Sequence, residues 1–418
     1  MRQSVRRVAN AVGAAAVLAA VASFTACWRL AAAPYHPPPV PVAETSSSDV
    51  TSRGPLRSGT DAVPLPGHPG VSVVRGAHAY AQHNEGERFV NQETTPDKSL
   101  VDVLRWQLGR LRGGQRGAWR NWTPVRQSVP PRRVSSGVNV TWVNHATVLV
   151  QLDGVNLIID PVYSDRVSPV GFAGPQRKHA PGVAFEQLPA IDVVVVSHSH
   201  YDHLDLATLK RLAQRDDPAV IVGLGNAAYL AARSVPGAMD VDWGDMVRVS
   251  LAGSADGDEA DSAARNVVRI TFVPARHWSA RARSDRRRTL WGGYVVEGPS
   301  GRVYLGGDSG YGAHYADARA RFGPFDVAIL PIGAYRPEWF MASNHMSPAD
   351  AVRAARDLGA PVSIPVHHST FNLGDDGQDE PIAALRAALA ASPGAPVFRI
   401  LAPGEMWSTT RSALNSVP

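Results

Sequence analysis

The sequence contains little cysteine and little lysine, and each shortage excludes a class of protein. Its 418 residues include one cysteine, Cys27, which excludes an intramolecular disulfide framework and a zinc module built from several cysteines. Lysine occurs only at positions 98, 178 and 210, so 39 of the 42 Lys and Arg residues are arginines. No basic run is long enough to indicate a nucleic-acid-binding tail, and we expect no nucleic-acid partner.

Charge is also sparse beside the apolar content. Charged residues make up 19% of the chain and hydrophobic residues 44%, with a formal net charge of +5. This balance excludes a disordered polyelectrolyte and a membrane protein with many spans. The length and apolar content suffice for one large domain or two ordinary ones.

The N-terminus has the composition of an export signal. Arg2, Arg6 and Arg7 precede an uncharged stretch, 8–28, that is rich in alanine and valine. Its end, Phe24-Thr25-Ala26-Cys27, resembles a bacterial lipobox, and the resemblance implies that Cys27 is acylated and becomes the mature N-terminus. We therefore expect an exported lipoprotein anchored on the periplasmic or cell-surface side of a membrane. An uncleaved signal anchor and a plain cleaved signal are the alternatives, and both also predict export.

Composition divides the chain into four parts. We expect a signal or lipoprotein segment over 1–27, a Pro/Ser/Gly-rich linker over 28–85, an N-terminal helical extension over 86–136 and a main domain over 137–418. Within the extension, apolar residues recur at near-helical spacing over 100–111, with arginines among and after them. This pattern predicts a basic amphipathic helix. It either docks on the main domain, which we favour, or contacts anionic lipid.

The main domain alternates strand and helix patterns. Apolar runs on either side of the turn signal Asp153-Gly154 predict a β-hairpin, and four valines at 193–196 predict a buried strand. Apolar residues at helical spacing predict helices over 204–212 and 382–391, and Ser347 before a proline predicts a third helix start. The polar stretch 252–264 predicts a surface loop. Together these patterns predict a layered α/β domain.

A cluster of metal-ligating side chains follows the strand predicted at 193–196. Burying such groups unpaired would be costly, whereas binding a cation removes that cost. His198 and His200 point to the same side of an extended segment and can bind one metal ion, and the ligands past the turn can face a second. Imidazole and carboxylate without thiolate favour zinc, with iron or manganese as alternatives. The cluster reads His198-Ser199-His200-Tyr201-Asp202-His203.

Seven further motifs accompany this string. They are Val140-Thr141-Trp142-Val143-Asn144-His145-Ala146-Thr147, Asp160-Pro161, Pro274-Ala275-Arg276-His277-Trp278, Gly306-Gly307-Asp308-Ser309-Gly310, Arg321-Phe322-Gly323-Pro324-Phe325-Asp326, Pro331-Ile332-Gly333-Ala334-Tyr335 and Val366-His367-His368-Ser369-Thr370-Phe371. The H-x-H-x-D-H string is the signature of the metallo-β-lactamase superfamily. The further motifs resemble its N-acyl-phosphatidylethanolamine-hydrolysing phospholipase D family, in the same order, over roughly residues 88–410. The chain departs from that family at Asn144, where glycine usually precedes the histidine.

The resemblance implies an α/β fold of the αββα metallo-β-lactamase type with two metal ions, expected to be zinc. It implies that one ion is held by three histidines, the other by one aspartate and two histidines, and that Asp308 bridges the two. The strand face shared by the apolar residues of 362–366 and the family register both select His367 over His368. The implied ligands are His198, His200 and His277 for the first ion, and Asp202, His203 and His367 for the second.

Two cations at such a site would bridge a water molecule and lower its pKa to about 7, which supplies hydroxide as the nucleophile. We expect catalytic roles for Asp202, Asp308 and His345. His345 precedes a predicted helix start and can hydrogen-bond a phosphate or protonate the leaving group. Asp160 more plausibly orients a ligand than binds metal, and we expect His145 to be structural or to support a ligand.

The family implies a phosphodiesterase that cleaves the distal phosphodiester bond of N-acyl-phosphatidylethanolamine or a related phospholipid and leaves phosphatidic acid. We expect a phospholipid substrate, a membrane surface and, from the family, a homodimer as partners. The alternatives are another hydrolase of this fold, such as a sugar-phosphate lactonase, and a non-catalytic metal-binding lipoprotein. Four apolar side chains expected near the cleft favour lipid: Trp278, Trp339, Phe340 and Met341.

Overall fold

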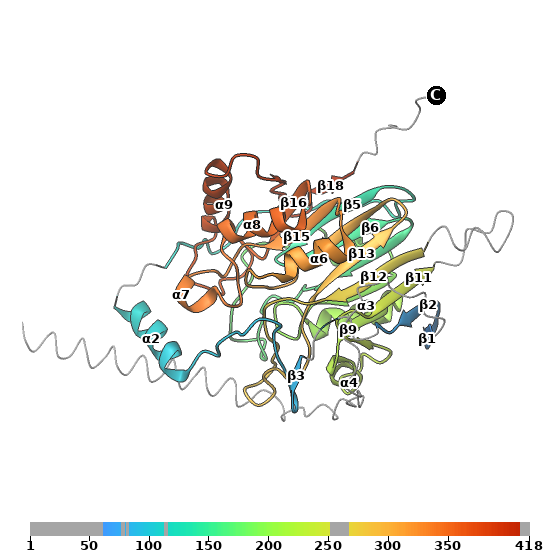
Figure 1. Cartoon of the computed structure of the whole chain (residues 1–418), viewed down its shortest axis with the longest axis horizontal. Coiled ribbons are helices and arrows are strands. Elements are labelled where there is room, and N and C mark those ends of the chain that lie inside the picture. The colour runs from blue at the N-terminus through green and yellow to red at the C-terminus, as the bar shows by residue number, and fades with distance from the viewer. Residues whose placement is uncertain (1–61, 77–79, 81–82, 113–115, 251–266, 410–418) are drawn as a thin grey trace, which may run out of the picture.

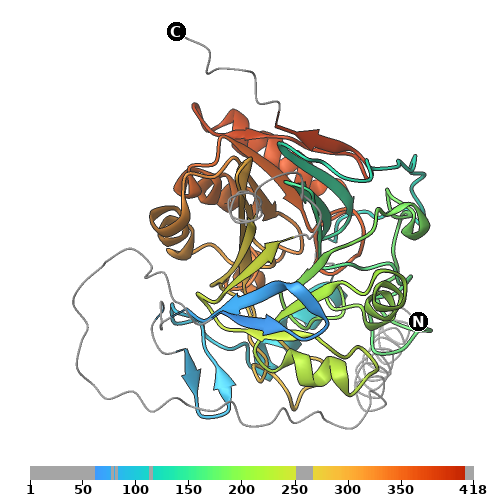
Figure 2. The same ribbon diagram turned by 90° about the vertical axis from the view of Figure 1, so that its right-hand side faces the viewer.

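Two β-sheets face each other, and helices cover the outer face of each (Figures 1 and 2). This computed structural model describes residues 62–76, 80, 83–112, 116–250 and 267–409. The four layers confirm the predicted αββα sandwich. Export signal, lipobox and Cys27 lie outside the described residues, as does the loop predicted at 252–264.

The first sheet has nine strands and changes direction near its middle. Neighbours are antiparallel from β1 to β14 and parallel from β14 to β17. In spatial order the strands are β1 (Val63–Leu65), β2 (His68–Val74), β11 (Met246–Ser250), β12 (Val267–Val273), β13 (Gly293–Gly298), β14 (Gly301–Leu305), β15 (Val327–Pro331), β16 (Val362–Val366) and β17 (Val397–Phe398).

The second sheet has seven strands and contains the predicted hairpin. Asp153 and Gly154 have φ values of 48° and 85°, which suits the tight turn between β6 and β7. The predicted buried strand 193–196 is β8, parallel to both its neighbours. In spatial order the strands are β10 (Met239–Val241), β9 (Ala219–Gly223), β8 (Val193–Val196), β7 (Val155–Ile159), β6 (Thr147–Leu152), β5 (Val138–Asn144) and β18 (Met406–Ser408).

Three apolar layers hold the sandwich together. Between the sheets, Trp142 and Val150 belong to one buried cluster with Phe272 and Tyr294 of the facing sheet. On the outer face of the second sheet, apolar residues of β8 and β9 pack with α3 (Leu206–Asp216) and α4 (Asn226–Ala231). On the outer face of the first sheet, β14 and β15 pack with α6 (His314–Phe322) and α8 (Pro348–Leu358), and α9 (Glu380–Ala390) lies against α8.

Capping residues determine where α8 and α3 begin. Ser347 caps α8 by accepting a hydrogen bond from the Asp350 amide at 3.2 Å, which confirms the predicted start. The helix predicted over 204–212 begins at Leu206, because Asp205 accepts the amides of Ala207 and Thr208 as its N-cap. The remaining elements are short: β3 (Asn84–Glu85), β4 (Arg88–Phe89), η1 (Phe185–Gln187) and α7 (Glu338–Met341).

The N-terminal part of the described chain belongs to the sandwich. Strand β2 pairs with β11, and Leu65, Val71 and Val73 are buried in the core between the sheets. The linker predicted over 28–85 is therefore wrong from residue 62 onward, because pairing at the sheet edge outweighs the local proline and glycine content. The predicted helical extension over 86–136 contains one α-helix, α2 (Leu100–Leu111), followed by irregular chain bonded to the domain at Lys178 and Gly182.

Among the described residues, no helix is long and apolar enough to cross a lipid bilayer.

Candidate metal centre

The candidate ligands lie at one edge of the two sheets. Strands β7 and β8 are parallel, and β12, β14 and β16 also share one direction through their pairing with β13 and β15. The chain leaves each of these strands at its carboxyl end and turns into the loops where sites form. The residues that follow are Asp160 after β7, His198 after β8, His277 after β12, Asp308 after β14 and His367 after β16.

The first donor group consists of three imidazoles, of which His198 and His277 are buried and His200 is partly exposed. His200 Nδ1 lies 2.9 Å from His198 Nε2 and 3.2 Å from His277 Nε2. Burial lowers the pKa of His200 to about 3, and it holds the pKa of His198 and His277 well below the usual range. Neutral imidazoles with converging nitrogen atoms form a donor set suited to a cation. The structure thus brings together the three histidines predicted for the first ion.

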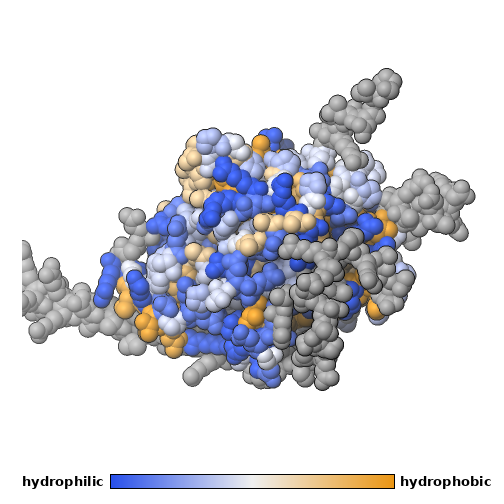
Figure 3. Space-filling model, in the orientation of Figure 1, coloured by the Kyte–Doolittle hydropathy of each residue, from blue (hydrophilic) through white to orange (hydrophobic). Residues whose placement is uncertain are grey.

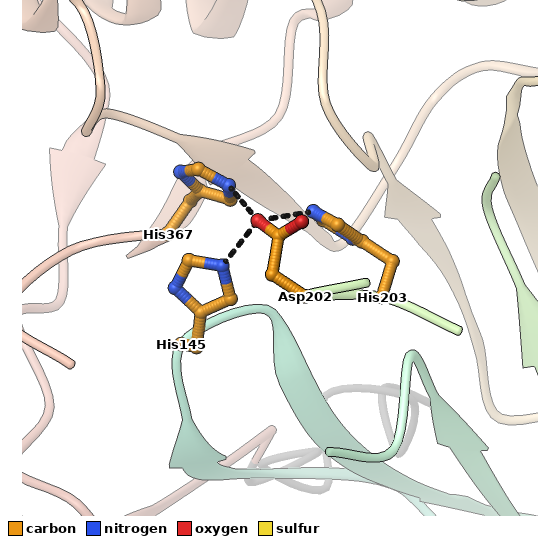
Figure 4. Close-up of side chains that lie close together, drawn as sticks. All are labelled: His145, Asp202, His203 and His367. Carbon is orange, nitrogen blue, oxygen red and sulfur yellow. Dashed lines mark hydrogen bonds and ion pairs between the residues drawn. The ribbon is translucent and has the colours of Figure 1, made fainter. Parts of the chain in front are cut away.

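The second donor group gathers around the Asp202 carboxylate (Figure 4). Its Oδ2 lies 3.4 Å from His203 Nε2 and 3.3 Å from His367 Nε2. His145 Nε2 also lies 3.0 Å from this oxygen, so a fourth nitrogen joins the group. This contact, made from the β5–β6 turn, is consistent with the structural or supporting role expected of His145. In the sequence, the His145-Ala146-Thr147 motif is the feature that could have indicated the position of His145 beside this donor group.

Asp308 lies between the two donor groups. Its Oδ2 is 3.2 Å from His203 Nε2, 3.1 Å from His367 Nε2 and 3.8 Å from His277 Nε2. Burial alone would raise the pKa of Asp308, but His367 and His203 hold it well below its usual range. Conversely, Asp308 and Asp202 overcome the effect of burial on His367 and raise its pKa to about 9. The buried Asp308 and the largely buried Asp202 therefore favour positive charge at this point of the fold.

Several donor atoms in this cluster have no hydrogen bond among the described residues. They include His203 Nε2, His367 Nε2 and Asp308 Oδ1, all buried. A buried polar atom left unpaired costs about 1–3 kcal/mol, so such atoms are rare without a partner. Metal ions coordinated by these atoms would satisfy them, and the mixture of imidazole and carboxylate fits zinc. The residues present therefore fit the predicted metal centre.

Hydrogen bonds from Nδ1 to residues outside the donor groups fix the orientation of two of the imidazoles, His203 and His277. His203 Nδ1 donates to Asp160 Oδ2 at 2.7 Å, and the same carboxylate accepts the amide and hydroxyl of Ser197 at 2.7 Å each. His277 Nδ1 donates to the Asn344 carbonyl at 3.0 Å. Each bond turns Nε2 toward the cluster. Asp160 thus occupies the orienting position expected of it.

The backbone around the centre adopts an uncommon conformation. His145, Asp160 and His367 have φ values of 44°, 46° and 61°, in the left-handed region that non-glycine residues rarely adopt. Gly307, just before Asp308, has φ of 58°, and a Cβ there would lie 2.8 Å from Ser197 Cβ. These turns direct the ligands off the strand ends and into one volume.

His345 lies at the rim of the centre. Its Nδ1 is 3.7 Å from Asp308 Oδ2, and the side chain is 16% exposed. Burial lowers the pKa of His345 to about 4. His368 points elsewhere: its ring packs against Trp142 at 4.6 Å, and its Nδ1 lies 2.9 Å from Ser369 Oγ. The structure therefore places His367, and not His368, in the cluster.

The apolar side chains expected near the cleft lie in different environments. Trp278 packs edge-on to His200 with ring centroids 4.4 Å apart, beside the first donor group. Trp339 is 44% exposed and Phe340 is partly buried, whereas Met341 is buried. The expectation that Met341 faces lipid is therefore wrong, because Met341 is the buried residue at the end of α7.

Comparisons with known proteins point to the same fold. A family model described as "Beta-lactamase superfamily domain" matches residues 155–368. An uncharacterised protein of Mycobacterium tuberculosis is 37% identical over 329 residues, 76% of this chain and 82% of that protein. The N-acyl-phosphatidylethanolamine-hydrolyzing phospholipase D 1 of Caenorhabditis elegans is 37% identical over 247 residues, 57% of this chain and 66% of its own.

A solved structure has a fold similar to that of this chain. The isothiocyanate hydrolase from Delia radicum gut bacteria is 20% identical, with a TM-score of 0.50 over 65% of this chain and 99% of its own, a likeness of fold alone. The matched family model begins at β7 and ends just after His367, so it covers most of the strand ends that carry the donor groups. The chain belongs to the metallo-β-lactamase superfamily.

Proposed function

We propose that this protein is a binuclear metal-dependent phosphodiesterase that hydrolyses N-acyl-phosphatidylethanolamine or a related phospholipid, releasing phosphatidic acid. The observation that carries the proposal is the position of Asp308, whose Oδ2 lies within 3.8 Å of nitrogen atoms from both donor groups. One carboxylate shared by two ligand sets suits two closely spaced cations. Such a pair is a common device for in-line displacement at phosphorus.

Some side chains of the site would bind the metal ions, and others orient the metal-binding imidazoles. When bound, two divalent cations, zinc in the first instance, would supply Lewis acidity and activate water near neutral pH. His198, His200 and His277 would hold one of them, and Asp202, His203 and His367 the other. Asp160 and the Asn344 carbonyl keep two of these imidazoles in the ligating orientation.

His345 is suited to a contact with the substrate. Its Nδ1 is buried and forms no hydrogen bond among the described residues, although it faces the centre. A phosphoryl oxygen or the leaving alcohol would provide the missing partner. The neighbouring serines do not offer a nucleophile, because Ser197 Oγ donates to Asp160 and Ser309 Oγ donates to the Gly310 carbonyl, each at 2.7 Å. These bonds support direct attack by water.

The choice of a phospholipid rests on similarity. The Caenorhabditis elegans relative, whose printed name gives this substrate, shares 37% identity over 247 residues. Trp278 beside His200 and the exposed Trp339 add apolar surface near the site. We also propose that the chain is exported and anchored through Cys27, which would keep it next to such a substrate.

A substrate panel with metal analysis of the same sample tests the proposal. The full chain would be assayed on vesicles of N-acyl-phosphatidylethanolamine, phosphatidylethanolamine and phosphatidylcholine, and on a sugar-phosphate lactone. We expect phosphatidic acid from the first, in proportion to bound metal, and a loss of about 100-fold or more in His345→Ala. Lactone opening without phosphatidic acid would replace this function with the lactonase alternative. Metal binding without turnover of any substrate would favour a non-catalytic protein.

A further inference from the structure

Helix α2 displays an apolar stripe to the solvent. Five aliphatic side chains on one side of the helix are between 44% and 72% exposed, and none of the twelve residues is buried. Their spacing of three and four residues places them on one face. In Figure 3 this apolar surface gathers at the lower left, where Figure 1 shows α2. The stripe consists of Leu100, Val101, Leu104, Leu108 and Leu111.

The helix is held to the domain through a different face. Trp106 Nε1 donates to Asp375 Oδ2 at 2.6 Å, and Arg110 Nε donates to Asp375 Oδ1 at 2.6 Å. The Trp106 ring also packs on Phe340 of α7, with centroids 4.7 Å apart. The favoured expectation that the helix docks on the main domain therefore holds only for this edge. The apolar stripe is left without a cover among the described residues.

The charges around the stripe are almost all positive. Residues 98–120 contain six Lys and Arg residues and one acidic residue, Asp102. The Asp102 carboxylate caps the helix start, accepting the Ser99 amide at 2.8 Å. Arg105 and Arg112 are exposed, and both line the same groove as Val101, Leu104 and Leu108 of the stripe. An apolar stripe with a basic border is complementary to a layer of anionic headgroups above an acyl interior.

The stripe is also connected to the metal centre. The Arg105 guanidinium lies over the Trp339 ring, 4.7 Å from its centroid, and a groove of about 700 Å³ runs between α2 and the chain at 336–339. The Met341 carbonyl at the end of α7 accepts the amides of Asn344 and His345 at 2.8 and 2.9 Å. The chain that follows α7 therefore carries both His345 and the carbonyl that orients His277.

We propose that the stripe on α2, together with Trp339, is a membrane-binding surface that inserts into the headgroup region of an anionic phospholipid bilayer. Bound there, α7 and the rim of the metal centre would lie next to the bilayer surface. This inference concerns binding alone, and it can fail or succeed independently of the hydrolysis proposed above. A second copy of the chain and the N-terminal segment 1–61 are the competing occupants.

A fluorescent label on the stripe tests the insertion directly. In a full-length Cys27→Ser background, Leu104→Cys would carry a single environment-sensitive nitrobenzoxadiazole group. A matched label at Val129→Cys, exposed but remote from α2 in sequence, serves as the control. With vesicles of phosphatidylglycerol we expect a blue shift and a rise in emission at position 104 and no change at 129. Vesicles of pure phosphatidylcholine should give a smaller effect, and high salt should weaken binding.

Charge variants complete the test. Arg105→Gln and Arg112→Gln should each lower the partition coefficient for phosphatidylglycerol vesicles about 5-fold. Arg248→Gln, an exposed arginine on β11, should leave it unchanged. The proposal fails if the labelled chain sediments with vesicles while position 104 shows no blue shift, because another segment then binds the lipid. It also fails if the emission of the label at position 104 shifts to the blue without lipid. A shift that grows with protein concentration indicates that a second copy covers the stripe. A shift that does not depend on concentration indicates that the N-terminal segment covers it.

Discussion

His203 donates a hydrogen bond from Nδ1 to Asp160 Oδ2 at 2.7 Å, and both side chains are fully buried. This bond fixes the tautomer of His203 and points Nε2 at Asp202 and Asp308. Removing the orienting partner of a metal-ligating histidine typically lowers metal affinity by roughly 10–100-fold. The loss of this hydrogen bond should therefore be measurable as weaker metal binding.

Asp160→Asn should weaken binding at the second donor group by about 10–100-fold while leaving the three-histidine group nearly unchanged. Titration with zinc against a competing chelator would resolve the two affinities. Asp153→Asn is the matched control, because Asp153 also has a left-handed φ of 48° but lies at the β6–β7 turn. Equal weakening at both sites would show that Asp160 supports the fold rather than His203.

Asp308→Asn should lower the rate of hydrolysis by more than about 100-fold, because Asp308 is the carboxylate shared by both donor groups. This loss exceeds the one expected when only a residue that orients a ligand is removed. The wild-type chain should carry close to two transition-metal ions, measured by elemental analysis of the assayed sample. Thermal unfolding followed by circular dichroism would show whether the variant folds, and we expect the fold to be retained because the core lies between the sheets. Full activity with one ion per chain would rule out the binuclear arrangement.

The direct attack by water proposed above would distinguish this site from one that uses a side-chain nucleophile. A phosphoryl-enzyme intermediate can be intercepted by an added alcohol, whereas one-step hydrolysis cannot. Assays in ethanol should therefore yield phosphatidic acid with little phosphatidylethanol, and one oxygen from isotopically labelled water should enter the phosphate. Substantial phosphatidylethanol would assign a covalent role to one of the histidines. Labelled oxygen in a released fatty acid would indicate an acyl-ester hydrolase.

Cys27→Ser should abolish incorporation of labelled palmitate in cells, because Cys27 is the only thiol in the sequence. Hydrolysis by the purified variant should persist, since the donor groups begin at residue 145. Mass spectrometry of the mature N-terminus would check the processing. A wild-type chain that takes up no palmitate and keeps residues 1–27 would favour the signal-anchor alternative.

The features of this site that depend on residues close together in the chain could be predicted from the sequence. Four valines followed by His198-Ser199-His200 predict a buried strand that ends in ligands, and the structure has β8 and the three-histidine group there. The Asp153-Gly154 turn and the Ser347 cap were predictable for the same reason: each depends on a few consecutive residues. For His277, Asp308 and His367 the sequence alone offered strand ends, and the family resemblance supplied their roles.

The tertiary structure decided what depends on distant partners. Parallel pairing gives β7 and β8 one direction, and β12, β14 and β16 share one direction in the other sheet, so within each sheet the loops that follow leave at one edge. Packing of the two sheets against each other then brings the ligands from both sheets together. The same packing brings His145 Nε2 to 3.0 Å from Asp202 Oδ2. It also drew β2 into the sheet against its local composition, and it left the apolar stripe of α2 exposed, because Asp375 holds the helix by its other face.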